Sequence, residues 1–167
     1  TDHWKKGDLF LSLRNINTIV LYRPSEDKVV KIITGPFFMQ HDVDIVSDHE
    51  ISIFNNNTLY TKSGPKTENI NILIYNFKNN SFNKIFDESI NEIEIKTGAG
   101  GLSDFLNDGS ILIEEQAKGR LLLIDENGDL EWEYVNKSKD NKVYQLNWSR
   151  IIKDEEHIKK LRYKIEN

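Results

Sequence analysis

Two side chains near the start of the chain, Arg14 and His41, could act together on a negatively charged group. An imidazole can serve as a nucleophile, a general base or a ligand near neutral pH. A guanidinium presents a planar fork of donors that fits the oxygens of a sulfate or phosphate. The pair therefore suits transfer of an oxyanion. The simpler alternative is that His41 caps a turn and Arg14 forms a surface salt bridge.

A repeated pattern surrounds these two residues. Three segments each begin with a turn residue and continue with apolar residues, and they lie at 7–11, 49–53 and 109–113. The offsets between them are 42 and 60 residues. The first offset is the length of one four-stranded propeller blade. The second requires an insertion, which we place in the polar stretch 55–71.

Further apolar runs, separated by polar turns, complete each repeat. A second apolar run follows each opening strand, at 18–22, 70–75 and 120–124. A third run follows the next turn, at 28–33, 82–86 and 130–134. Two further runs precede the second and third opening strands, at 41–46 and 102–106. Alternation of apolar and polar residues, as in 130–134, is typical of a half-buried strand. We therefore expect one all-β domain over 1–167, part of a β-propeller with about three to four four-stranded antiparallel blades. Their expected bounds are 7–35, 41–90, 101–136 and a partial blade at 144–152, followed by a short helix-like segment at 154–161.

The topology of such blades brings particular residues to one rim. The start of an inner strand and the end of the next strand share the same mouth of the central channel, which is where His41 and Arg14 fall. The polar residues that end the second strand of a blade should therefore lie near that mouth, and Arg120 either reaches the channel or bridges blades. The candidates for substrate binding are Asn55, Asn56, Glu114 and Arg120, with Glu115 beside them. We expect Trp4, Trp132 and Trp148 to pack between blades.

Composition excludes several classes of function. The net charge of −5 gives no basic face for nucleic acid. The absence of cysteine excludes disulfides and thiol catalysis, and no two histidines have metal-ligand spacing, so we expect no metal and no cofactor. The apolar runs are too short to span a bilayer, so we expect no membrane partner.

Three stretches of the sequence resemble the propeller of bacterial aryl sulfotransferases. They are 7–19, the segment 35–54 that contains Gln40-His41-Asp42, and the third repeat from Gly109 to Tyr134. The resemblance covers 7 to about 136. It implies that His41 is transiently sulfated and that Arg14 binds the sulfuryl oxygens. An aspartate that is common in the family is replaced here by Asn55.

The resemblance also implies an activity and a set of partners. The activity is transfer of a sulfuryl group from an aryl sulfate to a phenol, without a nucleotide cofactor, in the periplasm or outside the cell. We expect the chain to be the C-terminal portion of a longer propeller, with its end faces covered by the remaining blades or by a second copy of the chain. The alternative is a non-catalytic propeller whose channel mouth binds a small anion or a protein.

Overall fold

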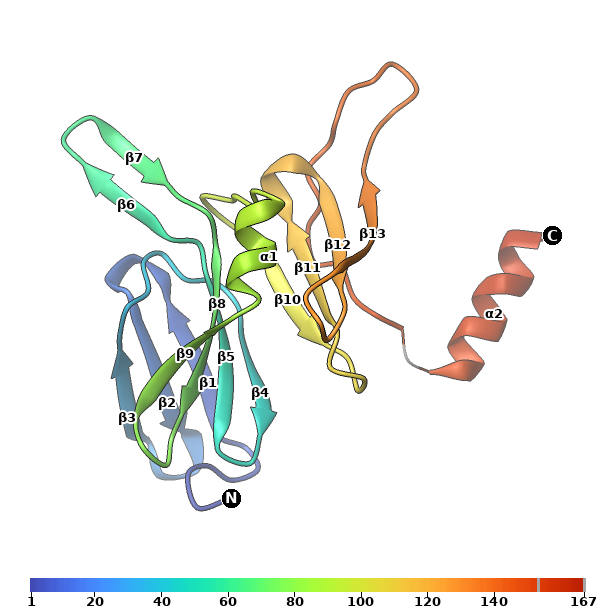
Figure 1. Ribbon diagram of the computed structural model, residues 1–167. Coiled ribbons are helices and arrows are strands. Elements are labelled where there is room, and N and C mark those ends of the chain that lie inside the picture. The colour runs from blue at the N-terminus through green and yellow to red at the C-terminus, as the bar shows by residue number, and fades with distance from the viewer. Residues whose placement is uncertain (153, 167) are drawn as a thin grey trace.

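The computed structural model describes residues 1–152 and 154–166, and over this part the chain is built almost entirely from antiparallel sheets (Figure 1). The first sheet has three strands: β1 (Leu9–Leu13), β2 (Thr18–Arg23) and β3 (Lys28–Thr34). The second has the order β4 (Val43–Ser47), β5 (Glu50–Asn55), β8 (Asn71–Asn76) and β9 (Ser81–Ile85). The third has the order β10 (Leu102–Phe105), β11 (Ile111–Glu115), β12 (Arg120–Ile124) and β13 (Leu130–Val135). The all-β prediction is confirmed, while the arrangement of these sheets as propeller blades stays a prediction.

Each sheet forms because its strands alternate in sequence and are joined by tight turns. Turn residues adopt the left-handed backbone conformation where the chain reverses, as at Asn17, Asp27 and Asn80. Such positions favour asparagine, aspartate and glycine, which are the residues that bounded the predicted strands. The first repeat lacks a leading strand, as expected, and forms the three-stranded sheet.

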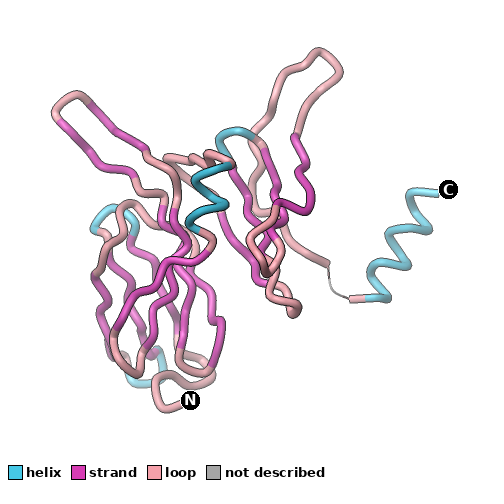
Figure 2. The backbone as a smooth tube through the Cα atoms, in the orientation of Figure 1, coloured by secondary structure: helices cyan, strands magenta, loops and turns pink. Residues whose placement is uncertain are grey.

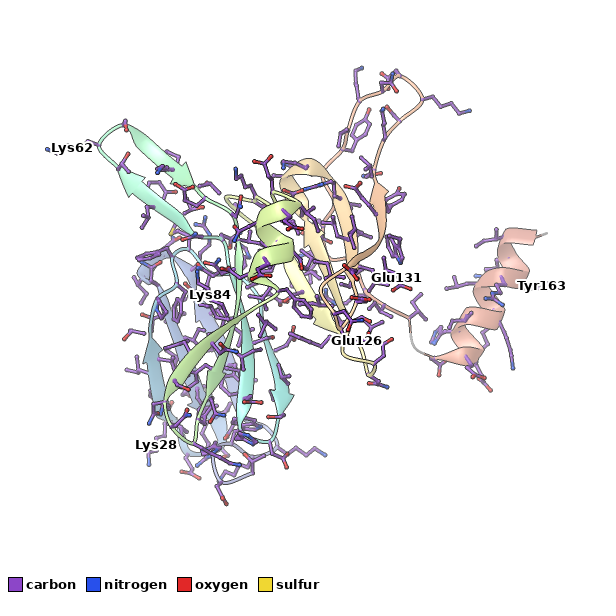
Figure 3. All side chains as sticks on the ribbon, viewed as in Figure 1. Lys28, Lys62, Lys84, Glu126, Glu131 and Tyr163 are labelled. Atoms are coloured by element: carbon purple, nitrogen blue, oxygen red, sulfur yellow. The ribbon has the colours of Figure 1, made fainter. Side chains whose placement is uncertain are left out.

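The insertion predicted in 55–71 is a separate hairpin. It consists of β6 (Thr58–Thr61) and β7 (Gly64–Thr67), which project away from the second sheet (Figure 2). The labelled Lys62 lies at the tip of this hairpin, and Lys28 lies at the outer edge of the first sheet (Figure 3). A second insertion that the sequence did not predict is the one-and-a-half-turn helix α1 (Asp87–Glu92), whose Ile90 is fully buried.

Two apolar cores lie between successive sheets. The first joins sheets one and two and includes Trp4, whose indole lies 5.1 Å from the ring of Phe77. The second joins sheet two, α1 and sheet three, and is centred on isoleucine side chains such as Ile72 and Ile111. Each fully buried isoleucine contributes about 1.5–3 kcal/mol relative to an exposed one. Every residue of β11 is buried, including two glutamates, and Ile111 and Ile113 belong to this second core.

The C-terminal part differs from the prediction. Residues 144–152, expected to begin a further blade, form no strand, because none of the described strands pairs with them. They run back across the third sheet instead (Figure 1). The helix α2 (Glu155–Glu166) is longer than the segment predicted at 154–161 and lies apart from the sheets in Figure 1. No helix in the described ranges is long and apolar enough to cross a membrane.

Candidate functional site

A pocket of about 310 Å³ opens between the second and third sheets. It is lined by residues from four places in the sequence, among them His41, Asp42, Glu114, Gln116, Trp148 and Arg150. The loop of Gly100 and Gly101 forms another part of its wall. The volume is at the lower end of the roughly 300–1,000 Å³ that small-molecule pockets have. One predicted catalytic residue, His41, therefore borders a cavity of suitable size.

The backbone of His41 is fixed by strand pairing that continues beyond β4. Its N–H donates to the carbonyl oxygen of Phe54 at 2.9 Å, and the N–H of Phe54 donates to the carbonyl oxygen of Asp42 at 2.9 Å. The side chain is half-buried at the pocket wall. Burial, and then the positive charge of Arg14, lower the pKa of His41 below its ordinary value. The imidazole is therefore neutral near pH 7, with one ring nitrogen free to act as a nucleophile or base.

Arg14 comes from the first sheet, directly after β1, and reaches across to the loop before the third sheet. Its Nη2 donates to the carbonyl oxygen of Gly98 at 2.8 Å, and its Nη1 donates to Oδ1 of Asn15 at 3.2 Å. Its Nε is buried and has no protein partner. Arg14 is not among the residues that line the pocket, although its charge acts on His41. The fold therefore brings the two predicted residues into electrostatic contact from different sheets.

The two asparagines that were candidates for substrate binding are buried and hold loops. Asn55 accepts hydrogen bonds from the N–H of Phe38 at 2.8 Å and of Asn57 at 3.0 Å. The side-chain amide of Asn56 donates to the carbonyl oxygens of Thr97 and Gly100, both at 2.8 Å. Neither asparagine lines the pocket. Asn56 holds the loop that forms the pocket wall, whereas Asn55 holds the backbone at Phe38 and Asn57.

The acidic pair at the end of β11 divides between two roles. Glu114 lines the pocket and accepts a hydrogen bond from the N–H of Ser149 at 2.7 Å. Glu115 has no exposed side-chain surface and accepts from the N–H of Lys96 at 2.6 Å and from Nε of Arg120 at 2.5 Å.

Arg120 also donates to Glu133 at 2.9 Å and does not line the pocket. Its guanidinium is engaged by two carboxylates of the third sheet. Arg120 therefore balances the charge of the buried Glu115 and bridges two strands of the third sheet.

Sequence reasoning did not place Asp42, Trp148 or Arg150 at the pocket, and it gave Trp148 a packing role instead. Asp42 follows His41 directly, and its Oδ2 accepts a hydrogen bond from the N–H of Ser103 at 3.1 Å. Burial, with the negative charge of Asp44 adding to it, raises the pKa of Asp42 to about 7. Trp148 and Arg150 come from the segment that was expected to form a strand, and Trp148 is 72% exposed, so the prediction that it packs between blades is wrong. The adjacency of Asp42 to His41 was a usable signal; no periodicity marks the other two.

The model of a family described as Arylsulfotransferase (ASST) matches residues 1–137, which is most of the chain. This match confirms the resemblance stated from the sequence, and its bounds agree with the expected range of 7 to about 136. No curated protein matches the sequence. Trp148 and Arg150 lie beyond the matched range. Within the described part of the chain, no group of three or more metal-binding side chains comes together.

Proposed function

Because the chain belongs to the arylsulfotransferase (ASST) family, we propose that it transfers a sulfuryl group from an aryl sulfate to a phenolic acceptor through a sulfated His41. The observation that carries the proposal is the neutral, half-buried imidazole of His41 at a pocket wall, under the influence of the Arg14 guanidinium. A neutral imidazole is the form that attacks an electrophile. A guanidinium nearby balances the charge of the three sulfuryl oxygens.

The reaction proceeds in two displacements. The free ring nitrogen of His41 attacks the sulfur, a nitrogen–sulfur bond forms, and the bond from sulfur to the aryl oxygen breaks with its electron pair on the phenolate. The oxygen of an acceptor phenol then attacks the same sulfur and releases the neutral imidazole. Arg14 stabilises the charge that builds on the sulfuryl oxygens in both steps. Two easier steps replace one difficult transfer.

We assign the proton of the reaction to Asp42. The first displacement needs a proton for the departing phenolate, and the second releases one from the acceptor phenol. Asp42 lines the same pocket as His41, and burial raises its pKa to about 7. A group with that pKa gives and takes a proton readily near neutral pH. The same carboxyl can therefore supply the proton in one step and recover it in the other.

The sheets are proposed to be consecutive blades of a propeller. In support, apolar cores lie between neighbouring sheets, and both sheets that could end the array carry exposed apolar residues. Leu9, Leu11 and Leu13 alternate along β1 with 39–47% of their surfaces exposed. Trp132 and Tyr134 on β13 are 43% and 48% exposed. Uncovered apolar faces of this kind mark interaction surfaces, so we propose that further blades or a second copy of the chain cover them.

The test is incubation of the protein with 4-nitrophenyl sulfate, followed by peptide mass analysis for a sulfuryl adduct. We expect the adduct on His41, none in His41→Asn, and full labelling in the control variant His157→Asn, whose imidazole is exposed on α2. Arg14→Ala should slow labelling roughly 100-fold, since one donor to a developing oxyanion is commonly worth about 3 kcal/mol. Binding of sulfate without any adduct would refute the transferase and support the non-catalytic alternative.

A further inference from the structure

The segment 144–150, here called the strap, closes one side of the pocket. Its first residue is tied to the end of β13, because the N–H of Tyr144 donates to the carbonyl oxygen of Asn136 at 2.9 Å. Near its other end, the N–H of Ser149 donates to the buried carboxylate of Glu114 at 2.7 Å. The side chain of Gln116 donates to Oδ1 of Asn147 at 3.4 Å. The strap is therefore attached to the third sheet at both ends.

Trp148 has an unusual conformation at the centre of these contacts. Its backbone is left-handed, with φ of 63°. A bulky residue rarely adopts this conformation, and such strain persists where surrounding contacts impose it, often at binding sites. Here the hydrogen bond from Ser149 to Glu114 fixes the backbone next to the tryptophan. The large aromatic side chain of Trp148 is 72% exposed, although burial of its apolar surface would be favourable.

The indole and the neighbouring guanidinium form one surface of the pocket. The Cζ atom of Arg150 lies 5.0 Å from the centre of the Trp148 ring, and both residues line the cavity that His41 also lines. A guanidinium against one part of the indole holds the side chain in place by a cation–π interaction. Much of the ring is left open to solvent. An aromatic ring is the group that such a surface binds best, through stacking or edge contacts.

We infer that Trp148 and Arg150 form the subsite for the aromatic ring of the substrate whose sulfuryl group reaches His41. The inference rests on the proposed function for the identity of the anionic group, and it adds the residues that select an aryl over an alkyl ester. Because the strap lies outside the family-matched range 1–137, this selection belongs to the chain's own C-terminal segment. The pocket then binds the aromatic ring at the strap and the sulfuryl group at His41.

The experiment compares binding of 4-nitrophenyl sulfate and methyl sulfate by calorimetry. The wild type should bind the aryl ester more tightly, and Trp148→Leu should weaken that binding about five-fold while leaving methyl sulfate unchanged. Trp148→Phe is the matched control, because it keeps the ring and the strained backbone position; it should retain most of the aryl preference. An equal effect of Trp148→Leu on both esters, or no effect on either, would overturn the inference.

A measurement on the unaltered protein guards against a variant that misfolds. During titration with 4-nitrophenol, which has no sulfuryl group, the indole N–H resonance of Trp148 should shift, whereas that of the buried Trp4 should not. No shift at Trp148 would contradict the subsite. The two proposals can fail separately. An aryl preference without an adduct on His41 would support the subsite and refute the transferase. An adduct without an aryl preference would support the transferase and refute the subsite.

Discussion

Replacement of Arg120 by methionine should destabilise the protein without weakening ligand binding. The side chain of Arg120 is 16% exposed and pairs with Glu115, which has no exposed side-chain surface. Removing one partner of a buried ion pair typically costs about 3–5 kcal/mol, because the other charge remains buried. Glu115 keeps the N–H of Lys96 at 2.6 Å and Nζ of Lys118 at 3.2 Å. We therefore expect the lower end of that range, about 3 kcal/mol.

The assay is urea denaturation followed by circular dichroism, with two controls on the same carboxylate. Lys118→Met removes a partner that is 49% exposed and should cost less than about 1 kcal/mol. The double variant Glu115→Gln with Arg120→Met removes both charges while an amide oxygen still accepts from Lys96, so most of the lost stability should return. If Arg120→Met cost less than about 1 kcal/mol and weakened binding of 4-nitrophenyl sulfate, the structural role would be wrong.

Three further predictions concern the pocket and its strap. Arg14→Ala should raise the pKa of His41 only part of the way to its ordinary value, because burial still lowers it. NMR titration of the imidazole measures this pKa. An unchanged value would mean that Arg14 and His41 are not in electrostatic contact. Since the pKa of Asp42 is raised to about 7, the contribution of this carboxyl to stability falls as pH rises from about 4 to 7. Asp42→Asn should therefore be more stable than the wild type at pH 8 but not at pH 4. Equal differences in the free energy of unfolding by urea at the two pH values would refute the raised pKa. Gly119→Ala should loosen the strap, because the new Cβ would lie 2.1 Å from the carbonyl oxygen of Tyr144 and the φ of Gly119 is +59°. Amide hydrogen exchange in the strap should become faster. Unchanged exchange would count against the packing of Gly119 on Tyr144.

The sequence by itself predicted the sheets because their causes are local. Antiparallel strands joined by short turns follow from alternation of apolar and polar residues and from turn residues between them. The third repeat illustrates this: the apolar run 120–124, an Asn-Gly turn and the alternating run 130–134 became β12 and β13. Even the insertion in the second repeat was visible from the offset of 60 residues, although its form as a hairpin was not.

The meeting of Arg14 and His41 was predictable only as a topological expectation. The repeat indicated one rim for both, but the contact of Arg14 with Gly98 depends on the loop between α1 and β10. That loop has no periodicity, and its path is set by the buried amide of Asn56. Sequence spacing could not supply it, because the partners lie on elements that are distant in the chain.

The roles of Arg120, Trp148 and Asp42 were decided by the tertiary structure alone. Arg120 became structural because Glu115 is buried between sheets and its charge needs a partner. Asp42 acquired a raised pKa because the packing of sheets two and three removes water from it. Trp148 reached the pocket because the N–H of the next residue, Ser149, donates to the buried carboxylate of Glu114 and holds the strap against the third sheet. Local pattern fixes which residues form strands, whereas burial and contacts between distant segments fix what their side chains do.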